Sequence, residues 1–432
     1  MRTGVKNLTG SRLPLLPAGD SLHLRKNRCG SDVRPIPILT KVIERNVQLS
    51  FPHRIFFTDA VFHPANLVLQ QALHRAGESP GRDRKALMLV DDNVAAGQRG
   101  LVGSIAPWFE ANGGSVRLAA PPLILPGGED CKNNPRSVEQ LWRAIHEAGI
   151  DRHSYVLAMG GGAFLDLAGY ACATAHRGVR HIRMPATTLS QGDGGVGVKN
   201  GINWFRKKNW VGTFAVPWAV VNDFALLHSL APEVRREGII EAIKVALIRD
   251  AAFYHEMENG AEALAVLDAA LLRRVVQRSA ELHVEHICAG GDAFELGSAR
   301  PLDFGHWAAH RLEPDTAFRL SHGRAVAIGM ALDLTYAELA GLLSAQDAGR
   351  ILRLISRAGF ALYDPALSAR DASGRYSVIS GLEDFREHLG GELTITLVTA
   401  PGRAVEVHEM NPALIAAAIE KLEKLARTAL LK

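Results

Sequence analysis

The spacing of apolar residues changes at Pro232, and this change constrains the fold more than any other feature of the chain. From about Ile36 to Asn222, short apolar runs alternate with helix-like stretches, which is typical of strand–helix units around a mostly parallel sheet. After Pro232, apolar residues recur at three- and four-residue spacing, which predicts helices over residues 239–248, 264–282, 325–343 and 414–430. We therefore expect an α/β domain over residues 36–231 and a mainly helical domain over residues 232–432, with a late β-like pair near 393–398 and 404–407.

Basic residues crowd the first 35 positions of the chain. This segment carries seven Lys and Arg against two Asp, a charge of +5, whereas the whole chain carries +4. The basic residues therefore lie in a tail punctuated by Pro, Gly and Ser and not on a folded face, so we expect no nucleic-acid function. We interpret residues 1–35 as a disordered tail or an overextended start.

The remaining composition indicates an ordinary globular protein. The chain is 47% hydrophobic and 22% charged over 432 residues, which is enough to bury a large core. No segment has the unbroken apolar length of a membrane span, and the N-terminus lacks a secretory signal, so we expect no membrane partner and a cytoplasmic location. Four cysteines without CxxC spacing suggest neither disulfides nor a thiolate zinc site: Cys29, Cys131, Cys172 and Cys288.

A glycine triplet follows an apolar run that is expected to be a buried strand. Gly160, Gly161 and Gly162 come after Ser154–Met159 and precede a helix-like stretch. Glycines there let the backbone approach a pyrophosphate, and the helix N-terminus offers free N–H groups. Strand-to-helix turns also use glycine for structural reasons, and the triplet is not a GxGxxG fingerprint. A nucleotide site and a simple turn both fit these residues.

Polar residues near neighbouring strand ends favour the nucleotide interpretation. Asp91 and Asn93 are placed to accept hydrogen bonds from ribose hydroxyls, and a polar turn carries Glu129 and Lys132. Asp166, four residues beyond the triplet, lies among apolar residues and needs a partner if it is buried. It is either a simple helix-end carboxylate or a ligand near the nicotinamide.

One carboxylate and two imidazoles form a candidate metal site. Glu241, His306 and His322 suit zinc or a similar divalent ion and would leave a coordination position open for substrate oxygens. Glu241 lies in a helical segment that is apolar on nearly all sides, so its charge requires a cation. His310, four residues after His306, would share its helix face, and a core histidine pair is the competing interpretation.

Cationic and amide side chains point to a phosphate site. Lys199 and Lys208 flank a Gly/Asn-rich loop, and with Asn209, Lys244 and Arg177 they would surround a phosphomonoester. An ion pair with Glu241, one turn away, is the alternative explanation for Lys244. A solvated turn is the alternative for the basic run that contains Lys208.

With these motifs in order, the chain resembles the sugar phosphate cyclases, whose best-known member is 3-dehydroquinate synthase. The similarity runs from about residue 45 to residue 400. Its motifs are Met159–Gly162, Asp166–Gly169, Arg177–Gly178, Pro185, Asp193–Lys199, Lys208–Asn209, Glu241 with Lys244, Phe304–His306 and His322–Gly329. The segment Arg300–His310 looks more like the dehydroquinate-synthase-like proteins of Ebo-type metabolite clusters than like shikimate-pathway enzymes.

The resemblance implies a role for each residue. The metal ligands would be Glu241, His306 and His322. The catalytic and phosphate-binding residues would be Lys199, Asn209, Lys244, His310 and, across a dimer interface, Arg177, while Asp193 and Lys208 would contact ring hydroxyls. NAD would be bound by Asp91, Asn93, Glu129, Lys132, Gly160, Gly161, Gly162, Asp166 and Thr187.

The resemblance also implies a fold, cofactors and a reaction. It implies a Rossmann-like NAD-binding domain, a helical metal-binding domain, NAD with Zn²⁺ or Co²⁺, and a homodimer. The substrate would be a heptulose 7-phosphate, which loses phosphate and closes to a carbocycle by an intramolecular aldol reaction. NAD would be regenerated in each cycle.

Three departures from the dehydroquinate synthases bear on the substrate. His283 stands where a lysine is expected, Asp303 stands where an asparagine is expected, and a lysine is missing from Gly390–Thr396. In the family these positions surround a substrate carboxylate, and a carboxylate there would repel an anionic group. Only Arg300 remains as an obvious carboxylate partner, so we favour a neutral ketose phosphate.

Three other functions stay open on the sequence. The first is a true 3-dehydroquinate synthase that binds its keto-acid phosphate through Arg300. The second is a metal-dependent polyol dehydrogenase of the glycerol dehydrogenase type, which would release NADH and would not need three lysines. The third is a non-enzymatic NAD-binding module, which does not require an intact set of metal ligands.

Overall fold

The computed structural model describes residues 42–74, 83–205, 207–290, 294, 301–388 and 391–429. Residues 51–432 belong to one compact unit, and residues 42–50 belong to a separate N-terminal unit whose described residues are exposed and carry no helix or strand. The predicted tail and the expected start of the fold at Ile36 lie outside the described residues.

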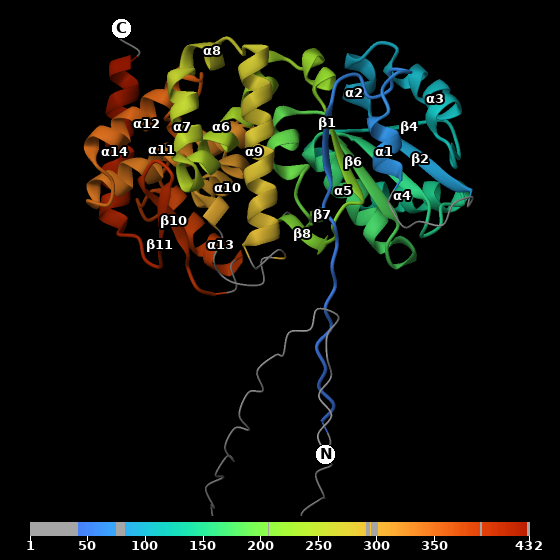
Figure 1. Ribbon diagram of the computed structural model, residues 1–432. Helices are drawn as coiled ribbons and strands as arrows, with labels where there is room; N and C mark the ends of the chain where they lie inside the picture. The colour runs from blue at the N-terminus through green and yellow to red at the C-terminus, as the bar shows by residue number, and fades with distance from the viewer. Residues whose placement is uncertain are drawn as a thin grey trace, which may run out of the picture. The chain divides into compact units, whose positions relative to one another are not determined.

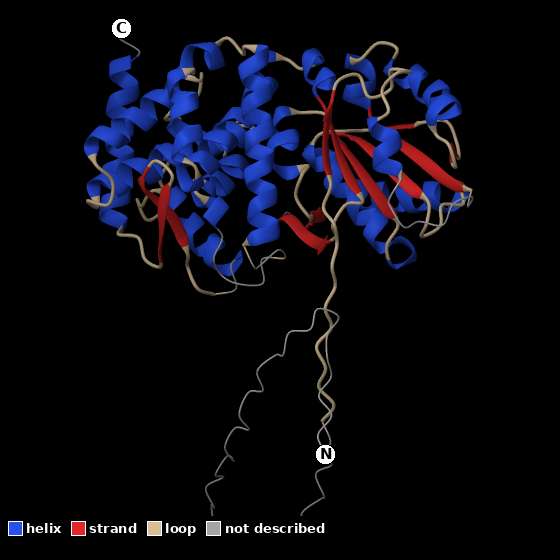
Figure 2. Cartoon of the chain, in the orientation of Figure 1, coloured by secondary structure: helices blue, strands red, loops and turns tan. Residues whose placement is uncertain are grey.

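A parallel sheet forms the first half of the compact unit (Figure 2). Its strands run in the order β1-β9-β6-β5-β2-β3, and β4 also pairs with β2. Every pairing in this sheet is parallel, which requires crossover connections and confirms the predicted α/β class. The strands are β1 Ile55–Thr58, β2 Arg84–Asp91, β3 Val116–Leu118, β4 Leu123–Leu125, β5 Tyr155–Gly160, β6 Arg180–Pro185 and β9 Ala219–Asp223.

Helices cover both faces of this sheet because alternate strand residues point to opposite sides. Met88 packs in one cluster with Trp108 of α3, whereas Leu87 packs in another with Ile145 of α4 and Leu165 of α5. The β-strands are therefore apolar on both faces, as the sequence indicates. The helices are α1 Val68–Leu73, α2 Asp92–Gly97, α3 Leu101–Asn112, α4 Pro135–Glu147 and α5 Gly162–Thr174.

An antiparallel hairpin of β7 (Lys199–Trp204) and β8 (Lys207–Phe214) interrupts the alternation between β6 and β9. A short π-helix, η3 (Ser190–Gly194), precedes it. The sequence pattern did not predict this hairpin. Its role is to bring residues from both of its strands back over α5 and η1 (Glu129–Lys132).

Helices dominate the chain after Pro232, as predicted (Figure 1). The predicted helix over 264–282 is interrupted, because Leu267 adopts a positive φ of 59° and Asp268 caps a new helix. A hairpin of β10 (Ile395–Ala400) and β11 (Arg403–Val407) confirms the late β pair. The helices are α6 Pro232–Arg249, α7 Ala251–Asn259, α8 Ala261–Ala265, α9 Ala269–Ala289, α10 His306–Asp315, α11 His322–Leu339, α12 Ala345–Arg357, α13 Gly381–His388 and α14 Pro412–Ala429.

The core of this helical part surrounds α6 and α11, which are buried along most of their lengths. None of the described helices is long and apolar enough to cross a membrane.

Candidate active site

Helix α6 places a carboxylate in the middle of the helical core. Glu241 is 1% exposed, and its Oε1 accepts no hydrogen bond from any described residue. Lys244, one turn along the same helix, is also buried and forms a close ion pair with Glu241. The ion pair considered from the sequence is therefore present. A buried carboxylate of this kind needs a cation, and Lys244 supplies one on one side only.

Two histidines approach Glu241 from the first residues of α10 and α11. The Nε2 atoms of His306 and His322 lie 3.9 Å and 3.8 Å from Oε1 of Glu241. The ligand atoms of all three residues lie within 4.8 Å of one another. The structure thus brings the three predicted metal ligands together, although they are far apart in sequence.

The other ring nitrogen of each histidine is already committed. Nδ1 of His306 donates to the carbonyl oxygen of Phe304 at 3.1 Å, and Nδ1 of His322 donates to Glu313 at 3.2 Å. Both Nε2 atoms are thereby left to face Glu241, the arrangement in which a second partner fixes a ligating imidazole. Burial holds the pKa of His306 well below its ordinary value, so that ring is neutral, as metal ligation requires. The residues fit a divalent ion with an open coordination position.

Glu313, which the sequence analysis missed, connects the predicted metal ligand His322 to the predicted phosphate residue Lys208. Its carboxylate accepts from His322 and from Nζ of Lys208, at 2.7 Å, while its side chain is 3% exposed. Burial would raise the pKa of Glu313, but the His322 hydrogen bond and Lys208 lower it to about 2. A signal was available, because Glu313 lies seven residues after His306 and so shares its helix face.

Asp193 and His283 lie beside Lys244. Nε2 of His283 is 3.0 Å from Oδ1 of Asp193, and Nζ of Lys244 is 3.9 Å from Oδ2. Burial would raise the pKa of Asp193, but His283 and Lys244 hold it well below its ordinary value. Nδ1 of His283 donates to the carbonyl oxygen of Ser279 at 2.9 Å. His283, which stands where the family has a lysine, is therefore already paired with Asp193 of the same chain.

Asp333 of α11, which the sequence analysis did not single out, holds the start of α10 by two hydrogen bonds. It accepts from the backbone N–H of Gly305 at 3.0 Å and from Nε1 of Trp307 at 2.8 Å. These two bonds flank His306 and fix its position. Burial raises the pKa of Asp333 to about 7. The signal in the sequence is a lone carboxylate within the long apolar run of α11.

Two further predicted site residues, His310 and Asp303, lie near this centre. The ring of His310 is exposed and lies 5.5 Å from that of His306 and 6.5 Å from that of His322, measured between centroids. Burial alone would lower the pKa of Lys244, but the nearby carboxylates raise it. Glu241 and Asp193 contribute most to this rise, and Asp303 contributes less. Lys199 opens β7 with an exposed side chain. Arg300 lies outside the described residues.

A pocket of about 160 Å³ lies where the glycine triplet meets α6. Predicted nucleotide residues contribute to its wall, and Glu237, one turn before Glu241, contributes from α6. Burial raises the pKa of Glu237, which the sequence analysis did not single out. The pocket is lined by Gly128, Glu129, Gly161, Gly162, Ala163, Phe164, Thr187, Leu189, Val234 and Glu237.

A buried lysine joins the remaining nucleotide residues to the hairpin. Lys132 is 3% exposed, lies 2.9 Å from Oδ2 of Asp166, and also makes a close contact with Asn209. Asp166 therefore has the partner that its apolar surroundings require. Asn209, predicted to bind phosphate, lies instead among predicted nucleotide residues, and Glu129 accepts from Asn203 of the same hairpin at 2.9 Å.

Asp91 and Asn93 lie at the end of β2, which neighbours β5 in the sheet. Asp91 caps α2 by accepting from the N–H of Asn93 at 2.9 Å. A Cβ at Gly160 would approach Cβ of Asp91 to 2.9 Å and Phe164 to 2.7 Å, so glycine is required for this close packing. The first glycine of the triplet thus meets a packing requirement, and the next two line the pocket.

Arg177 stands apart from all of these residues within one chain. Arg177 directly precedes β6, so it lies where the strands begin. The glycine triplet lies at the opposite end, where the neighbouring parallel strand β5 ends. Its side chain is exposed. A single chain thus does not bring Arg177 to the other predicted phosphate residues.

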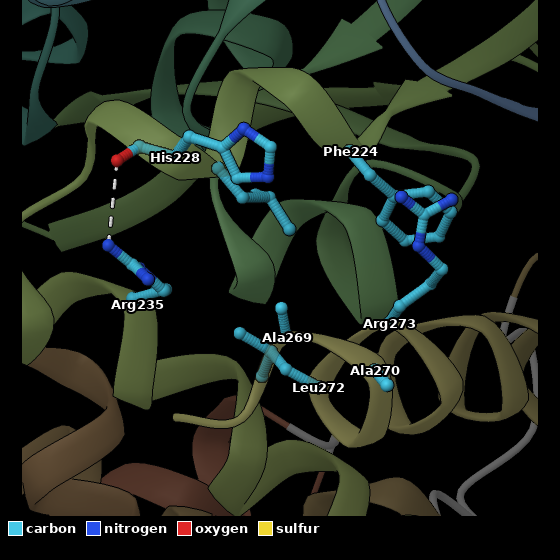
Figure 3. Close-up of a pocket in the computed structure, with 8 residues that line it drawn as sticks. Phe224, His228, Arg235, Ala269, Ala270, Leu272 and Arg273 are labelled. Carbon is cyan, nitrogen blue, oxygen red and sulfur yellow. Dashed lines mark hydrogen bonds between the residues drawn. The ribbon is translucent and has the colours of Figure 1, made fainter. Parts of the chain in front are cut away.

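A second pocket, of about 270 Å³, contains none of the predicted site residues (Figure 3). Arg273 of α9 stacks over the ring of Phe224 at 4.4 Å and forms a bidentate pair with Asp59, while Arg235 bonds the carbonyl oxygen of His228. The cationic groups in this pocket therefore already have partners. It is lined by Phe224, Leu227, His228, Arg235, Ala269, Ala270, Leu272 and Arg273.

Two family descriptions match adjacent parts of the chain. The first is "3-dehydroquinate synthase N-terminal", over residues 122–237, and the second is "3-dehydroquinate synthase C-terminal", over residues 238–373. The matches meet inside α6, between the pocket residue Glu237 and the metal-site residue Glu241.

Relatives and solved structures agree with this assignment. A 2-epi-5-epi-valiolone synthase of Streptomyces glaucescens is 33% identical over 380 residues, 87% of this chain and 92% of the relative. The structure of a 2-epi-5-epi-valiolone synthase from Streptomyces hygroscopicus, with NAD⁺ and Zn²⁺ bound, aligns with a TM-score of 0.76 at 25% identity, covering 88% of this chain and 99% of the other. A 2-deoxy-scyllo-inosose synthase, complexed with carbaglucose-6-phosphate, NAD⁺ and Co²⁺, shares the fold at a TM-score of 0.67 and 21% identity, over 85% and 96% of the two chains.

Proposed function

Because the chain belongs to the 3-dehydroquinate synthase family of sugar phosphate cyclases, we propose that it eliminates phosphate from a neutral heptulose 7-phosphate and closes the product to a carbocycle. The observation that carries this proposal is the convergence of Glu241, His306 and His322, with Glu313 connecting that cluster to Lys208. This connection supports one site in which Glu241, His306 and His322 would hold a metal and Lys208 would bind phosphate.

The cofactors of the proposed enzyme are NAD and Zn²⁺ or Co²⁺. Glu241, His306 and His322 would hold the metal, and the pocket at Gly161 and Gly162 would hold the nucleotide. Once bound, these groups supply Lewis acidity and reversible hydride transfer.

The protein's own residues bind and orient the substrate. Lys244, held between Glu241 and Asp193, stays charged in the buried site and can stabilise anionic oxygen. Lys208 and Lys199 would bind the phosphate, with His310 beside them. Asp193 is ionised, since its pKa is held low, and can accept a hydrogen bond from a ring hydroxyl.

The charges around Asp193 support a neutral substrate. His283 is bonded to Asp193 and to Ser279, so it offers no free cation to a carboxylate. Asp303 adds a negative charge near Lys244, where an anionic group would be repelled. The similarity to a 2-epi-5-epi-valiolone synthase over most of both chains supports the same substrate class.

We further propose that the active form is a homodimer in which Arg177 completes the phosphate site of the partner chain. Arg177 supports this by its place before β6, at the end of the strands opposite to the glycine triplet, because from there it is available to a site on a second copy.

Phosphate release by the purified, metal-loaded protein with NAD tests the proposed function. We expect release from sedoheptulose 7-phosphate and none from 3-deoxy-arabino-heptulosonate 7-phosphate. Release from the keto acid alone would make the protein a dehydroquinate synthase and overturn the argument from His283 and Asp303. Release from neither compound would contradict the proposal as a whole.

A further inference from the structure

Arg183, in β6, is a fully buried arginine without an ion-pair partner among the described residues. Buried arginines are usually paired with carboxylates, because a lone charge is costly to remove from water. Burial lowers the pKa of Arg183 accordingly. The guanidinium instead donates to five oxygen atoms, all of which belong to one short segment of the chain.

That segment runs from Gly194 to Asn200. Nη1 of Arg183 donates to the carbonyl oxygens of Gly194 at 3.1 Å, Gly195 at 3.3 Å and Gly197 at 3.1 Å. Nη2 donates to the carbonyl oxygen of Lys199 and to Oδ1 of Asn200, each at 2.6 Å. The planar guanidinium thus acts as the centre around which the loop is wound.

Besides Arg183, backbone hydrogen bonds hold this loop, among them Gly195 N–H to the Ser190 carbonyl oxygen at 2.8 Å and Ala215 N–H to that of Val198 at 2.9 Å. Three of its residues are glycines, which pack no side chain and leave the backbone free to adopt many conformations. Two other anchors hold its beginning, because the side chain of His53 bonds the carbonyl oxygen of Val196 at 2.6 Å and Ser279 donates to that of Gly192 at 3.0 Å. Neither anchor reaches the end of the loop, where Lys199 lies.

Asn200 fastens that end. Its Oδ1 accepts from Arg183, and its Nδ2 donates to the carbonyl oxygen of Val198 at 3.2 Å. The carboxamide lies against Gly169 of α5, where an added Cβ would stand 1.7 Å from Oδ1. Arg183, Asn200 and Gly169 therefore form one packed unit between the sheet and the hairpin.

We propose that Arg183 is a positioning residue, which holds the loop so that Asp193 at one end and Lys199 at the other face the same substrate. The inference rests on the proposed function, since it takes the roles of those two residues from it. It adds a requirement for a buried residue that does not itself touch the substrate. Loss of Arg183 would loosen the loop and weaken substrate binding while the nucleotide pocket stays intact.

The test compares two variants. Arg183→Gln removes both the positive charge and the planar guanidinium, whereas Arg183→Lys keeps the charge and removes only the guanidinium. Arg236→Gln is the matched control, because Arg236 also donates to backbone carbonyls, those of Ala265 and Ala358, but outside the loop. For each protein, hydrogen exchange of peptides covering residues 190–200, the NAD⁺ dissociation constant, and kcat and KM for phosphate release from sedoheptulose 7-phosphate are measured.

We expect faster exchange over residues 190–200 in both Arg183 variants, an unchanged NAD⁺ dissociation constant, and kcat/KM lower by about tenfold or more. Arg183→Lys should recover part of the loss, and Arg236→Gln should keep wild-type kcat/KM and wild-type exchange in the loop. If Arg183→Gln does not fold, Arg183→Lys carries the test.

Two results would overturn the inference: exchange in the loop that matches the wild type, or a loosened loop with wild-type kcat/KM. A uniform rise in exchange, with NAD⁺ affinity lost in parallel, would also overturn it, because Arg183 would then only stabilise the fold. Failure of the proposed function gives a different result. The wild-type protein would then release no phosphate, although exchange over residues 190–200 is slow in the wild type and faster in the Arg183 variants.

Discussion

At the residue scale, Glu313 determines how the two halves of the site are connected. A buried carboxylate with one cation would be a simple ion pair, but Glu313 has two donors, Nδ1 of His322 and Nζ of Lys208. The first is a proposed metal ligand, and the second is a lysine that would bind phosphate. A substitution of Glu313 should therefore change the orientation of both His322 and Lys208.

Glu313→Gln is predicted to weaken Zn²⁺ binding by roughly 10- to 100-fold, because the amide cannot orient His322 as a carboxylate does. Competition with a chromophoric chelator measures the Zn²⁺ dissociation constant. The control is Asp315→Asn on the same helix, whose carboxylate pairs with Arg311 and contacts no ligand. Equal Zn²⁺ affinity in wild type and Glu313→Gln would contradict the role given to Glu313.

Asp333 is predicted to make stability depend on pH. The pKa of Asp333 is raised from 3.8 to about 7. The protonated side chain therefore contributes to the free energy of unfolding fully below about pH 4, and this contribution is lost as pH rises through about 7. Relative to Asp333→Asn, the free energy of unfolding of the metal-free wild type should fall by on the order of 1 kcal/mol per pH unit between these values. Urea denaturation at several pH values measures this difference, and parallel profiles for the two proteins would rule it out.

Individual residues also show what a sequence reveals about a site. Glu241, His306 and His322 could be chosen because their residue types suit a metal and their surroundings are apolar. Arg183 could not be assigned a role in the same way, because its partners lie on other elements and depend on the fold. For Glu313 the sequence offered only its place on the helix face of His306. The contact between Asn209 and Lys132 was unexpected for the same reason.

At the element scale, the site depends on how closely α10 approaches α11. Gly329 of α11 makes this possible, since an added Cβ would stand 2.0 Å from the carbonyl oxygen of Gly305. Gly305 itself has a φ of 79°, which favours glycine, and it directly precedes His306. Two glycines on neighbouring elements therefore set the distance between the two imidazoles.

Gly329→Ala is predicted to destabilise the fold by about 1–3 kcal/mol, through overpacking, and to weaken metal binding by moving α10 away from α11. Gly349→Ala on α12 is the control, because its Cβ would meet only the end of the flexible Arg353 side chain, at 3.3 Å. This control should be neutral or more stable. Thermal denaturation and Zn²⁺ titration of both variants give the comparison, and equal behaviour would show that the glycine is dispensable.

Elements differ in how well the sequence predicted them. The parallel strands and α6, α11 and α14 follow directly from apolar spacing, because each buries a continuous face. The break at Leu267 and the β7–β8 hairpin were not predicted. A positive φ leaves no trace in the apolar spacing, and β7 is mostly buried although its sequence is rich in asparagine and glycine. The hairpin carries three residues of the proposed substrate site, Lys199, Lys208 and Asn209.

At the scale of the whole molecule, Arg177 distinguishes a site within one chain from a site shared between two. Arg177→Ala and Glu241→Ala should each abolish phosphate release on their own. When the two variants are co-expressed, a mixed dimer has one doubly damaged site and one intact site. Random assortment then predicts recovery of roughly a quarter of wild-type activity. No recovery in verified mixed dimers would show that Arg177 does not serve a partner's site.

The account of the whole molecule makes one claim above the others, that NAD is used and restored within each turnover of a phosphate-eliminating cyclase. The most direct test follows phosphate release and NADH absorbance together, with sedoheptulose 7-phosphate and an amount of NAD far below that of the substrate. We predict many equivalents of phosphate and carbocyclic product per NAD, with no accumulation of NADH. NADH that accumulates in proportion to substrate consumed, without phosphate release, would contradict the account and identify a polyol dehydrogenase.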